Sequence, residues 1–389
     1  MTRVLFVSNG HGEAAIGDRI AIELRAAAPQ IEIDHLALVG DGLSDVMNDV
    51  GPRRRMPSGG LIAMANLRNI GRDVRSGLLR LTLAQYRYLR AARGRYAVAV
   101  AIGDVYALIM TLVARAPTVF VGTAKSVSVA PYGPFEERVL RRARERFVRD
   151  DATVRSLAKH GLDVRPAANV IVDLFATAED AGADRAVEGF TPVLALFPGS
   201  REAAYADAVF LARVVRALAR KRRTLGGVLS ISPGLDPERF AADARADGWE
   251  VRRYGDDDAI AFDLRLDERV VVRAWRGPLG AILGRVSMVL GQAGTANEAA
   301  AAAGLPVVAF DRERDRKAKW YRQRQRGLLG DALAVFPDDL DAAVAGVAAL
   351  VDDAQRRAAM GRIGRERMGP PGAAARIAAC VATLARAAS

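Results

Sequence analysis

Short apolar runs alternate with longer amphipathic segments along most of the chain. Val4–Ser8 is an apolar run, followed by a glycine turn and a helical pattern that continues to about Ala28. Further apolar runs, separated by helical stretches, occupy 31–39, 96–102, 117–122 and 146–150. Apolar runs with helices between them are typical of a parallel sheet covered on both faces. The first half of the chain is therefore predicted to be a βαβ domain.

The same alternation restarts after a small, polar stretch. The second series opens at Val193–Phe197 and continues at 228–232, 269–274, 287–290 and 307–310. Gly369-Pro-Pro-Gly372 then precedes an alanine-rich helical stretch that ends near Ala387. We predict an N-terminal domain, a linker, a C-terminal domain and a terminal helix that packs back toward the N-terminal domain, over residues 1–178, 179–191, 192–368 and 369–389. The fold class expected is α/β, with two Rossmann-like doubly wound domains facing across a cleft at the carboxyl ends of their strands.

Composition narrows the class of protein. With 51% hydrophobic and 26% charged residues, the chain is globular and too apolar to be disordered. Its one cysteine, Cys380, excludes a disulfide framework and a cysteine-rich metal site, and fits a reducing compartment. No run approaches the roughly 20 apolar residues of a membrane span. The start offers four apolar residues in a row, too few for a signal-peptide core. A cytoplasmic location is expected.

The net charge of +12 is concentrated in one segment. Residues 53–95 carry 11 arginines and one acidic residue, Asp73. Apolar residues recur there at helical spacing, from Leu67 to Leu81, while Arg68, Arg72 and Arg75 share another face. Such a helix binds an anionic membrane surface or phosphates, or packs its apolar face on its own domain. Nucleic acid is not the expected partner, because no aromatic residue lies between the arginines before Tyr86.

The first candidate site follows the first predicted strand. Gly10-x-Gly12-x-x-Ala15 matches a dinucleotide fingerprint, with Asp34 about 20 residues further on. Glu13 argues against this interpretation, since its charge would repel a pyrophosphate at the helix start. Alternatively, Gly10 and Gly12 let a substrate hydroxyl come close, with His11 or Glu13 as general base. A tight turn with a helix-capping carboxylate is the structural alternative.

Two further motifs also follow predicted strands. Asp104, after Gly103, either points into the ligand crevice or caps the next helix. In Pro198-Gly199-Ser200-Arg201, amides at a helix start are expected to hold a phosphate, with Arg201 adding charge.

The strongest motif is Gly291-Gln-Ala-Gly294-Thr295-Ala-Asn-Glu298, between a strand and a helix. Gly291 and Gly294 leave amides free for phosphate oxygens at the helix N-terminus. Glu298, one turn into the helix, is placed to accept hydrogen bonds from two ribose hydroxyls. Thr295-x-x-Glu298 is also a capping box, in which Glu298 would turn to the backbone instead.

The sequence offers few candidate metal ligands. Asp256-Asp257-Asp258 is interpreted as a solvated loop, because no strand leads into it directly and no histidine is near. The three histidines are residues 11, 35 and 160, so none lies in the second half. A histidine-based zinc site or triad spanning both halves is excluded.

Taken in order, these motifs resemble a known family. Ser8–Glu13, Gly103-Asp104, Asn169–Asp173, Pro198–Arg201 and Gly294–Glu298 together resemble the lipid-A-disaccharide synthase-related proteins, which are two-domain glycosyltransferases of the GT-B type. The run from Thr295 to Pro306 is also similar to the transferase that adds N-acetylglucosamine to form lipid II. The resemblance covers nearly the whole chain, and the order of the motifs carries it.

The resemblance implies a function and its parts. It implies a UDP-sugar donor bound mainly by the second domain, a lipid-linked or glycolipid acceptor bound by the first, and chemistry without metal or cofactor on the inner face of the cytoplasmic membrane. Glu298 would hold the ribose, Gly294 and Thr295 the pyrophosphate, and Gln323 or Gln325 the donor sugar. Residues 198–201 would line the donor side. For the base that activates the acceptor hydroxyl, the preferred order is Glu13, His11, Asp104.

Departures from the family limit what the resemblance implies. Asn169, a candidate substrate-binding residue, lacks the proline that usually follows it, and His11 replaces the residue of true lipid A synthases. The acyl-sugar acceptor of those enzymes is therefore not carried over. A UDP-sugar 2-epimerase, which shares the two-domain fold but uses second-domain histidines, is the alternative. A non-catalytic nucleotide-sugar or glycolipid binder on the same scaffold is another.

Overall fold

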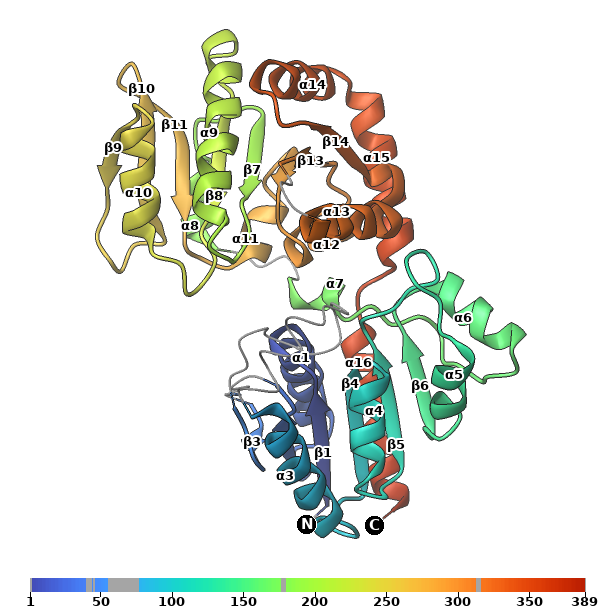
Figure 1. Ribbon diagram of the computed structural model, residues 1–389. Coiled ribbons are helices and arrows are strands. Elements are labelled where there is room, and N and C mark those ends of the chain that lie inside the picture. Colours follow the sequence, from blue (N-terminus) through green and yellow to red (C-terminus); the bar gives the residue numbers. More distant parts are fainter. Residues whose placement is uncertain are drawn as a thin grey trace. The chain divides into compact units, whose positions relative to one another are not determined.

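A computed structural model describes residues 2–39, 44, 46–54, 77–175, 180–312 and 316–388 (Figure 1). The chain divides into two units, residues 1–174 with 371–389 and residues 175–370. Each unit is built on one largely parallel sheet with helices on both faces. The expected α/β class with two doubly wound domains is confirmed.

The sheet of the first unit is entirely parallel, in the order β3-β2-β1-β4-β5-β6. Its central strands are the apolar runs found in the sequence, because strands buried on both faces carry few polar residues. The strands are β1 (Arg3–Ser8), β2 (Glu32–Ala37), β3 (Asn48–Asp49), β4 (Val98–Gly103), β5 (Thr118–Gly122) and β6 (Glu145–Val148).

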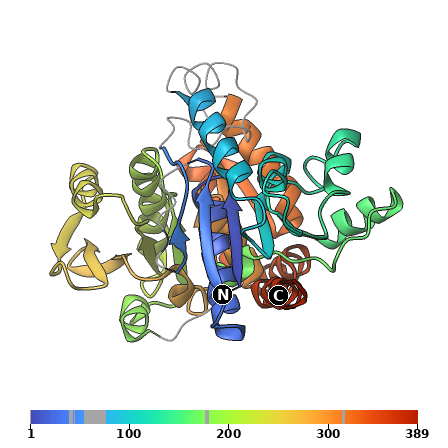
Figure 2. The same cartoon turned by 90° about the horizontal axis from the view of Figure 1, so that it is seen from below.

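Helices from both ends of the chain cover this sheet. One face packs against α1 (His11–Ala27), α7 (Ile171–Leu174) and α16 (Ala373–Ala387), in a core that includes Ile20, Ile102 and Ile377. The other face packs against α3 (Leu78–Ala91), α4 (Val105–Leu112) and α5 (Pro134–Leu140). Helix α6 (Asp151–Lys159) follows β6. The two ends of the chain lie side by side at one end of this unit (Figure 1 and Figure 2).

One carboxylate ties the terminal helix to the rest of the first unit. The backbone amides of Gly372 and Ala374, at the start of α16, donate to Asp173 at 2.6 and 2.7 Å. A carboxylate at a helix N-terminus satisfies amides that have no partner within the helix and interacts favourably with the helix dipole. Asp173 of the Asn169–Asp173 motif therefore has a structural role.

The second sheet has the order β14-β13-β12-β7-β8-β11-β10-β9. It is parallel except that β10 runs antiparallel to both of its neighbours. The strands are β7 (Val193–Phe197), β8 (Gly226–Ser230), β9 (Glu250–Arg253), β10 (Ile260–Leu266), β11 (Arg269–Trp275), β12 (Met288–Gly291), β13 (Val307–Asp311) and β14 (Leu333–Pro337).

The core of the second unit lies between this sheet and three helices, α9 (Ala204–Lys221), α10 (Pro237–Ala246) and α14 (Leu340–Asp352). Other strands of the sheet contact α8 (Ala181–Val187) and α12 (Thr295–Ala302). The remaining helices are α11 (Leu279–Leu283), α13 (Arg316–Leu329), the 3-10 turn η1 (Gly330–Ala332) and α15 (Ala354–Met368).

The expected linker 179–191 differs from the structure. Its middle forms α8, whose Ala183 and Ala186 are fully buried and which packs on β8 and β11. The buried residues of this stretch are single alanines among polar residues, so they form no apolar run in the sequence. The stretch therefore has the composition of a linker although it folds as a helix. Of the basic segment 53–95, residues 55–76 lie outside the described residues. Within the described ranges, no helix is both long enough and apolar enough to cross a membrane.

Candidate functional site

Most of the candidate residues lie at the point where each sheet reverses its strand order. In the first unit the chain moves from β1 outward to β2 and β3, then returns to add β4 on the other side of β1. In the second unit it moves from β7 to β8 and later adds β12 on the other side of β7. Such a switch point leaves a crevice at the carboxyl ends of the two strands, where this type of sheet binds its ligands.

The loop after β1 carries the first group. Gly10 has a φ of +137°, which favours glycine, and it directly precedes α1. Glu13 lies in the first turn of α1, and its Cγ is 3.2 Å from where a Cβ on Gly103 would be. Gly12 has open space where a side chain would be. His11 begins α1, and its side chain lies outside the described part of the structure.

Asp104 caps the next helix, which is one of its two predicted roles, and also contacts the loop after β1. Its Oδ1 accepts from the amide of Ala107 at 3.1 Å and so caps α4. Its Oδ2 accepts from Asn9 Nδ2 at 3.0 Å, in the loop after β1. Burial raises the pKa of Asp104, although the hydrogen bonds to its carboxylate oppose the shift. Glu13 and Asp104 therefore belong to one group of polar side chains, with Asn9 between the two strand ends.

The dinucleotide interpretation of this loop loses support. Asp34, the acidic residue that would bind a ribose, is buried in β2. Its Oδ2 accepts from the hydroxyl of Tyr96 at 2.9 Å, and its Oδ1 accepts from Asn48 at 3.4 Å. Asp34 is thus occupied inside the sheet. Asn169 lies in the buried segment just before α7.

In the second unit, the loop after β7 differs from the expectation. Helix α9 begins at Ala204 with no side-chain cap, so the amides of Gly199 and Ser200 are not at a helix start. Gly199 instead turns the chain with a φ of +112°, and a Cβ there would lie 4.0 Å from the carbonyl oxygen of Gln292. The guanidinium of Arg201 lies 6.0 Å from the ring centre of Tyr321 in α13. The loop therefore lies against the loop that follows β12.

The loop after β12 leads into a helix whose first turn is open. Gly294 is the N-cap of α12, and as a glycine it has no side chain with which to cap the helix. Thr295 is the first residue inside the helix, so the predicted capping box does not form. Gly294 and Thr295 are exposed, and Glu298 is half-buried one turn further on. Exposed amides at a helix N-terminus suit an anion such as a diphosphate.

A network of buried polar side chains forms hydrogen bonds to the backbone of this loop and its neighbours. Gln325 Nε2 donates to the carbonyl oxygen of Ala293 at 2.8 Å, and its Oε1 accepts from Arg322 at 2.9 Å. Arg322 also donates to Gln292, whose side-chain amide donates to the carbonyl of Phe310 at 2.9 Å. Gln325 is therefore engaged with the loop in this structure. Gln323, two residues earlier in α13, is exposed.

The sequence motifs predicted no role for the other members of this network, Gln292, Asn297 and Arg322. Asn297 is fully buried and donates to the carbonyl of Gly291 at 3.1 Å. An asparagine among alanines at the start of a helix was the only sequence signal for a buried polar role. In the first unit, Asn9 was missed as the partner of Asp104, 95 positions away in the sequence.

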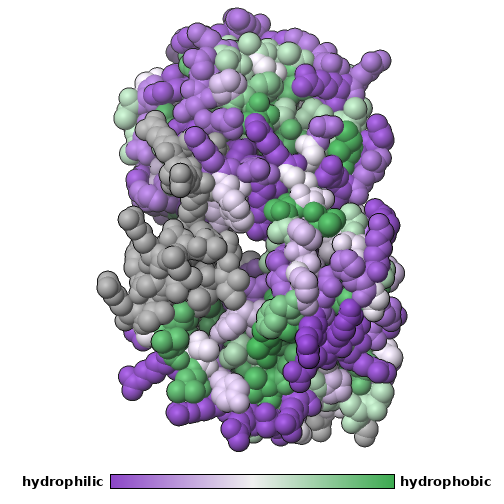
Figure 3. Space-filling model, turned by 45° about the vertical axis from the view of Figure 1, so that its right-hand side comes forward, coloured by the Kyte–Doolittle hydropathy of each residue, from purple (hydrophilic) through white to green (hydrophobic). Residues whose placement is uncertain are grey.

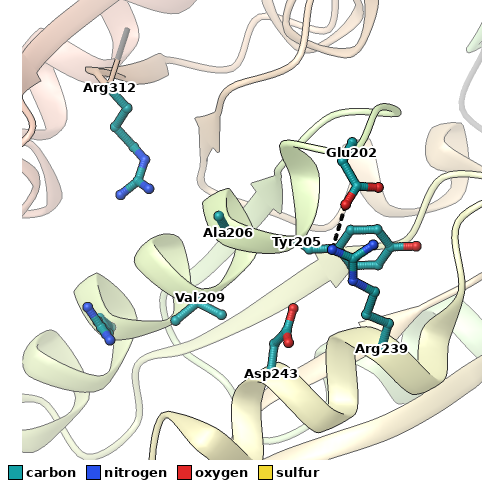
Figure 4. Close-up of a pocket in the computed structure, with 8 residues that line it drawn as sticks. Glu202, Tyr205, Ala206, Val209, Arg239, Asp243 and Arg312 are labelled. Carbon is teal, nitrogen blue, oxygen red and sulfur yellow. Dashed lines mark ion pairs between the residues drawn. The ribbon is translucent and has the colours of Figure 1, made fainter. Parts of the chain in front are cut away.

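A separate hollow lies on the outer side of α9 (Figure 4). It has a volume of about 500 Å³ and is lined by residues of α9 and α10, by Glu202 in the loop after β7 and by Arg312 directly after β13. Its arginines already have carboxylate partners: Arg239 pairs with Glu202 and Arg213 with Asp247, both at 2.5 Å, and Arg312 pairs with Asp207 at 2.8 Å. Because these cations are paired, we assign the hollow no ligand.

Comparisons with known proteins show the fold. No protein-family model and no curated protein matches the sequence. Among solved structures, MurG of Acinetobacter baumannii is similar at 14% identity and a TM-score of 0.58, covering 98% of this chain and 100% of that one. The calicheamicin glycosyltransferase CalG4 is similar at 15% identity and a TM-score of 0.58, with coverage of 99% and 98%. UDP-GlcNAc 2-epimerase of Neisseria meningitidis is similar at 13% identity and a TM-score of 0.58, with coverage of 98% and 99%.

We expect Gln325→Leu to destabilise the second unit. The substitution leaves the carbonyl of Ala293 and the donors of Arg322 and Asn297 without their partner, and an unpaired buried polar group costs about 1–3 kcal/mol. Chemical denaturation followed by circular dichroism measures this loss. Gln323→Leu is the matched control, because Gln323 is exposed on the same helix. Equal stability of the two variants would contradict the supporting role.

Proposed function

We propose that the protein is a glycosyltransferase that moves a sugar from a UDP-sugar donor to a hydroxyl of a lipid-linked or glycolipid acceptor at a membrane surface. The observation that supports it best is the different chemistry at the two switch points. The second unit offers the exposed start of α12 at Gly294 and Thr295, while the first offers carboxylates. A transfer reaction needs two substrate sites, and each unit carries one candidate.

On the donor side, the loop after β12 is the proposed diphosphate site. The amides at Gly294 and Thr295, the dipole of α12 and the charge of Arg201 would stabilise the negative charge that develops on the departing diphosphate. Glu298 is proposed to hold the ribose hydroxyls, one turn along the same helix. Because backbone amides supply the stabilisation, this mechanism does not call for a metal ion.

On the acceptor side, Glu13 is the proposed general base, followed by His11 and Asp104. Glu13 and Asp104 lie at neighbouring strand ends. A base is most effective when its pKa is close to the working pH, and burial shifts the pKa of Asp104 in that direction. The partner amide of Asn9 holds Asp104 in place, so Asp104 is suited to orient an acceptor hydroxyl for Glu13.

A UDP-sugar 2-epimerase is the second candidate, favoured by the similarity to the epimerase of Neisseria meningitidis over 98% of the chain. Changing the configuration at C2 of a sugar requires removing a hydrogen from that carbon and returning one from the other side. The second unit, residues 175–370, contains no histidine to shuttle that proton. This composition favours transfer over epimerisation.

We expect the protein to bind UDP and Glu298→Ala to weaken that binding roughly 10- to 150-fold, since hydrogen bonds to a charged group contribute about 1.5–3 kcal/mol. Isothermal titration calorimetry with UDP, GDP, ADP and TDP measures both affinity and base preference. Glu238→Ala is the matched control, because Glu238 occupies the first turn of α10. Unchanged UDP affinity in Glu298→Ala would exclude the ribose role.

We expect UDP-N-acetylglucosamine to gain no deuterium when it is incubated with the protein in D2O. A transferase breaks the bond between C1 and the diphosphate and leaves the C2 hydrogen in place. Proton NMR of the recovered nucleotide sugar reports exchange at C2 directly. Enzyme-dependent loss of the C2 proton signal would overturn the transferase in favour of the epimerase.

The helical layer of α3, α4 and α5 is the proposed membrane-facing surface. Five large apolar residues are exposed there, with Leu79 at 67% exposure, and they are Leu79, Leu83, Tyr86, Ile109 and Phe135. Residues 77–95 add five arginines, all exposed, and no acidic residue. Figure 3 shows one face of the molecule, on which hydrophobic patches lie between hydrophilic areas. Exposed apolar residues beside arginines suit anionic lipid headgroups above an apolar boundary.

We expect the protein to float with vesicles that contain anionic lipid and the double variant Leu79→Ser/Leu83→Ser to float less. Each arginine near an anionic surface contributes about 1 kcal/mol, and the apolar side chains add their burial in the lipid boundary. Ile22→Ser is the matched control, since Ile22 is exposed to 44%, close to the 47% of Leu83, but lies on α1 across the sheet. Equal recovery with neutral and anionic vesicles would reject the proposal.

A further inference from the structure

In the first unit, the buried polar atoms without partners are gathered at one edge of the sheet. Among the described residues of that unit, the buried side-chain nitrogen and oxygen atoms that make no hydrogen bond are Asn9 Oδ1, Thr123 Oγ1 and the hydroxyl of Tyr132. Asn9 follows β1, Thr123 follows β5, and Tyr132 lies in the loop before α5. Proteins leave few such atoms unsatisfied, because each has lost its hydrogen bonds to water.

Strand register brings these three atoms together. Gly103 and Gly122 are partner residues at the ends of β4 and β5, about 4.8 Å apart as in any parallel pair. The Cβ of Asn9 is 3.3 Å from where a Cβ on Gly103 would be, and the hydroxyl of Tyr132 is 2.6 Å from where one on Gly122 would be. The amide of Thr123 donates to the carbonyl of Gly103 at 3.1 Å. The three residues therefore lie around the carboxyl ends of β4 and β5, directly before Asp104 in the case of β4.

Two details define the chemistry of Tyr132. A side chain at position 122 would collide with its hydroxyl, so the glycine makes room for the phenol at the strand end. Burial raises the pKa of Tyr132, and the carboxylates of Glu136, Asp104 and Asp150 raise it further. The phenol therefore keeps its proton and can donate a hydrogen bond.

The charges around this edge are mostly negative. Asp104, Glu136 and Asp150 all act on the Tyr132 hydroxyl, and Glu13 lies against Gly103. Of the described cations, Arg149 acts on the same hydroxyl, while Lys125 is paired with Glu136 at 2.5 Å. A phosphate group carries at least one negative charge at neutral pH, so this excess of carboxylates would repel it. A hydroxyl group both donates and accepts, and it carries no charge.

We propose that Asn9, Thr123 and Tyr132, together with Asp104, form an acceptor subsite that binds a neutral, hydroxyl-rich group such as a sugar or polyol head group in preference to a phosphate. The proposal rests on the proposed glycosyltransferase function, since it names the chemical class of the acceptor. In it, Tyr132 donates to one acceptor oxygen while Asn9 and Asp104 accept from acceptor hydroxyls. Asn9, Thr123 and Tyr132 are binding residues, and Glu13 remains the proposed base.

The test is to titrate methyl glucoside, myo-inositol, N-acetylglucosamine 1-phosphate and inorganic phosphate into the full-length protein, with and without UDP. Ligand-observed NMR measures each affinity. We expect a neutral probe to bind more tightly than either phosphate. We expect Tyr132→Phe to weaken that binding roughly 3- to 10-fold, the value of one neutral hydrogen bond. Its melting temperature should be unchanged or higher, because the lost hydroxyl had no protein partner.

Tyr96→Phe is the control for a buried tyrosine that does have a partner. Its hydroxyl donates to Asp34, so this variant should lose melting temperature and keep the affinity for the neutral probe. If Tyr132→Phe instead lowered the melting temperature and kept the affinity for the neutral probe, the Tyr132 hydroxyl would have a structural role only, and the proposal would be overturned. Tighter binding of either phosphate, or no binding of a neutral probe while UDP still binds, would also overturn it and leave the donor side intact. Loss of UDP binding with the neutral-probe result retained would overturn the transferase function alone.

Discussion

The direction in which a parallel strand can be connected to the next determines where both candidate sites lie. A crossover between parallel strands is right-handed, so a chain that adds strands on both sides of its first strand must place helices on opposite faces of the sheet. In the first unit, α1 covers one face and α4 the other, and in the second unit the corresponding helices are α9 and α12. The loops that precede them diverge at the carboxyl ends of neighbouring strands. Asn9 and Asp104 can therefore form a hydrogen bond although 95 residues separate them.

The two switch points use this shared geometry in different chemical ways. In the second unit, side chains beneath the loop after β12 bond to one another and to loop carbonyls, and the exposed groups are those of the backbone. A network of this kind positions amides rigidly and leaves them directed outward. In the first unit, side chains themselves reach the edge, and three of their buried polar atoms have no partner among the described residues. Backbone amides suit a diphosphate, which is the same whichever sugar a nucleoside-diphosphate sugar carries. Side chains suit the part of a reaction that must distinguish one acceptor from another.

Much of the fold could be predicted from the sequence because central strands are apolar over their whole length. Two strands at one edge of the second sheet were missed: β9 is largely exposed, and β10 alternates apolar with polar residues around Asp263. At the candidate sites, the glycine motifs in the sequence predicted where the loops lie along the chain, but not which side chains contact them. Thr295 looked like an N-cap because threonine often is one, but the helix already begins at Thr295, and Gly294 before it is the N-cap. The hydrogen bond from Gln325 to the carbonyl oxygen of Ala293 depends on how α13 packs, and a local sequence pattern does not predict this packing.

The placement of the histidines bears on the choice between transfer and epimerisation. His35 is fully buried, its Nε2 lies 2.8 Å from Ser8 Oγ, and burial lowers its pKa, so it is neutral and enclosed by the first sheet. His160 lies at the end of α6, where its Nδ1 is 2.5 Å from Glu137. Neither is at a switch point, which leaves His11 as the histidine at a strand end. The residues at the second unit's switch point, including Arg201, Thr295 and Glu298, supply positive charge, a hydroxyl and one carboxylate. That set is suited to holding a diphosphate and a ribose, whereas exchanging a proton on both sides of a sugar carbon would need a second acid–base group.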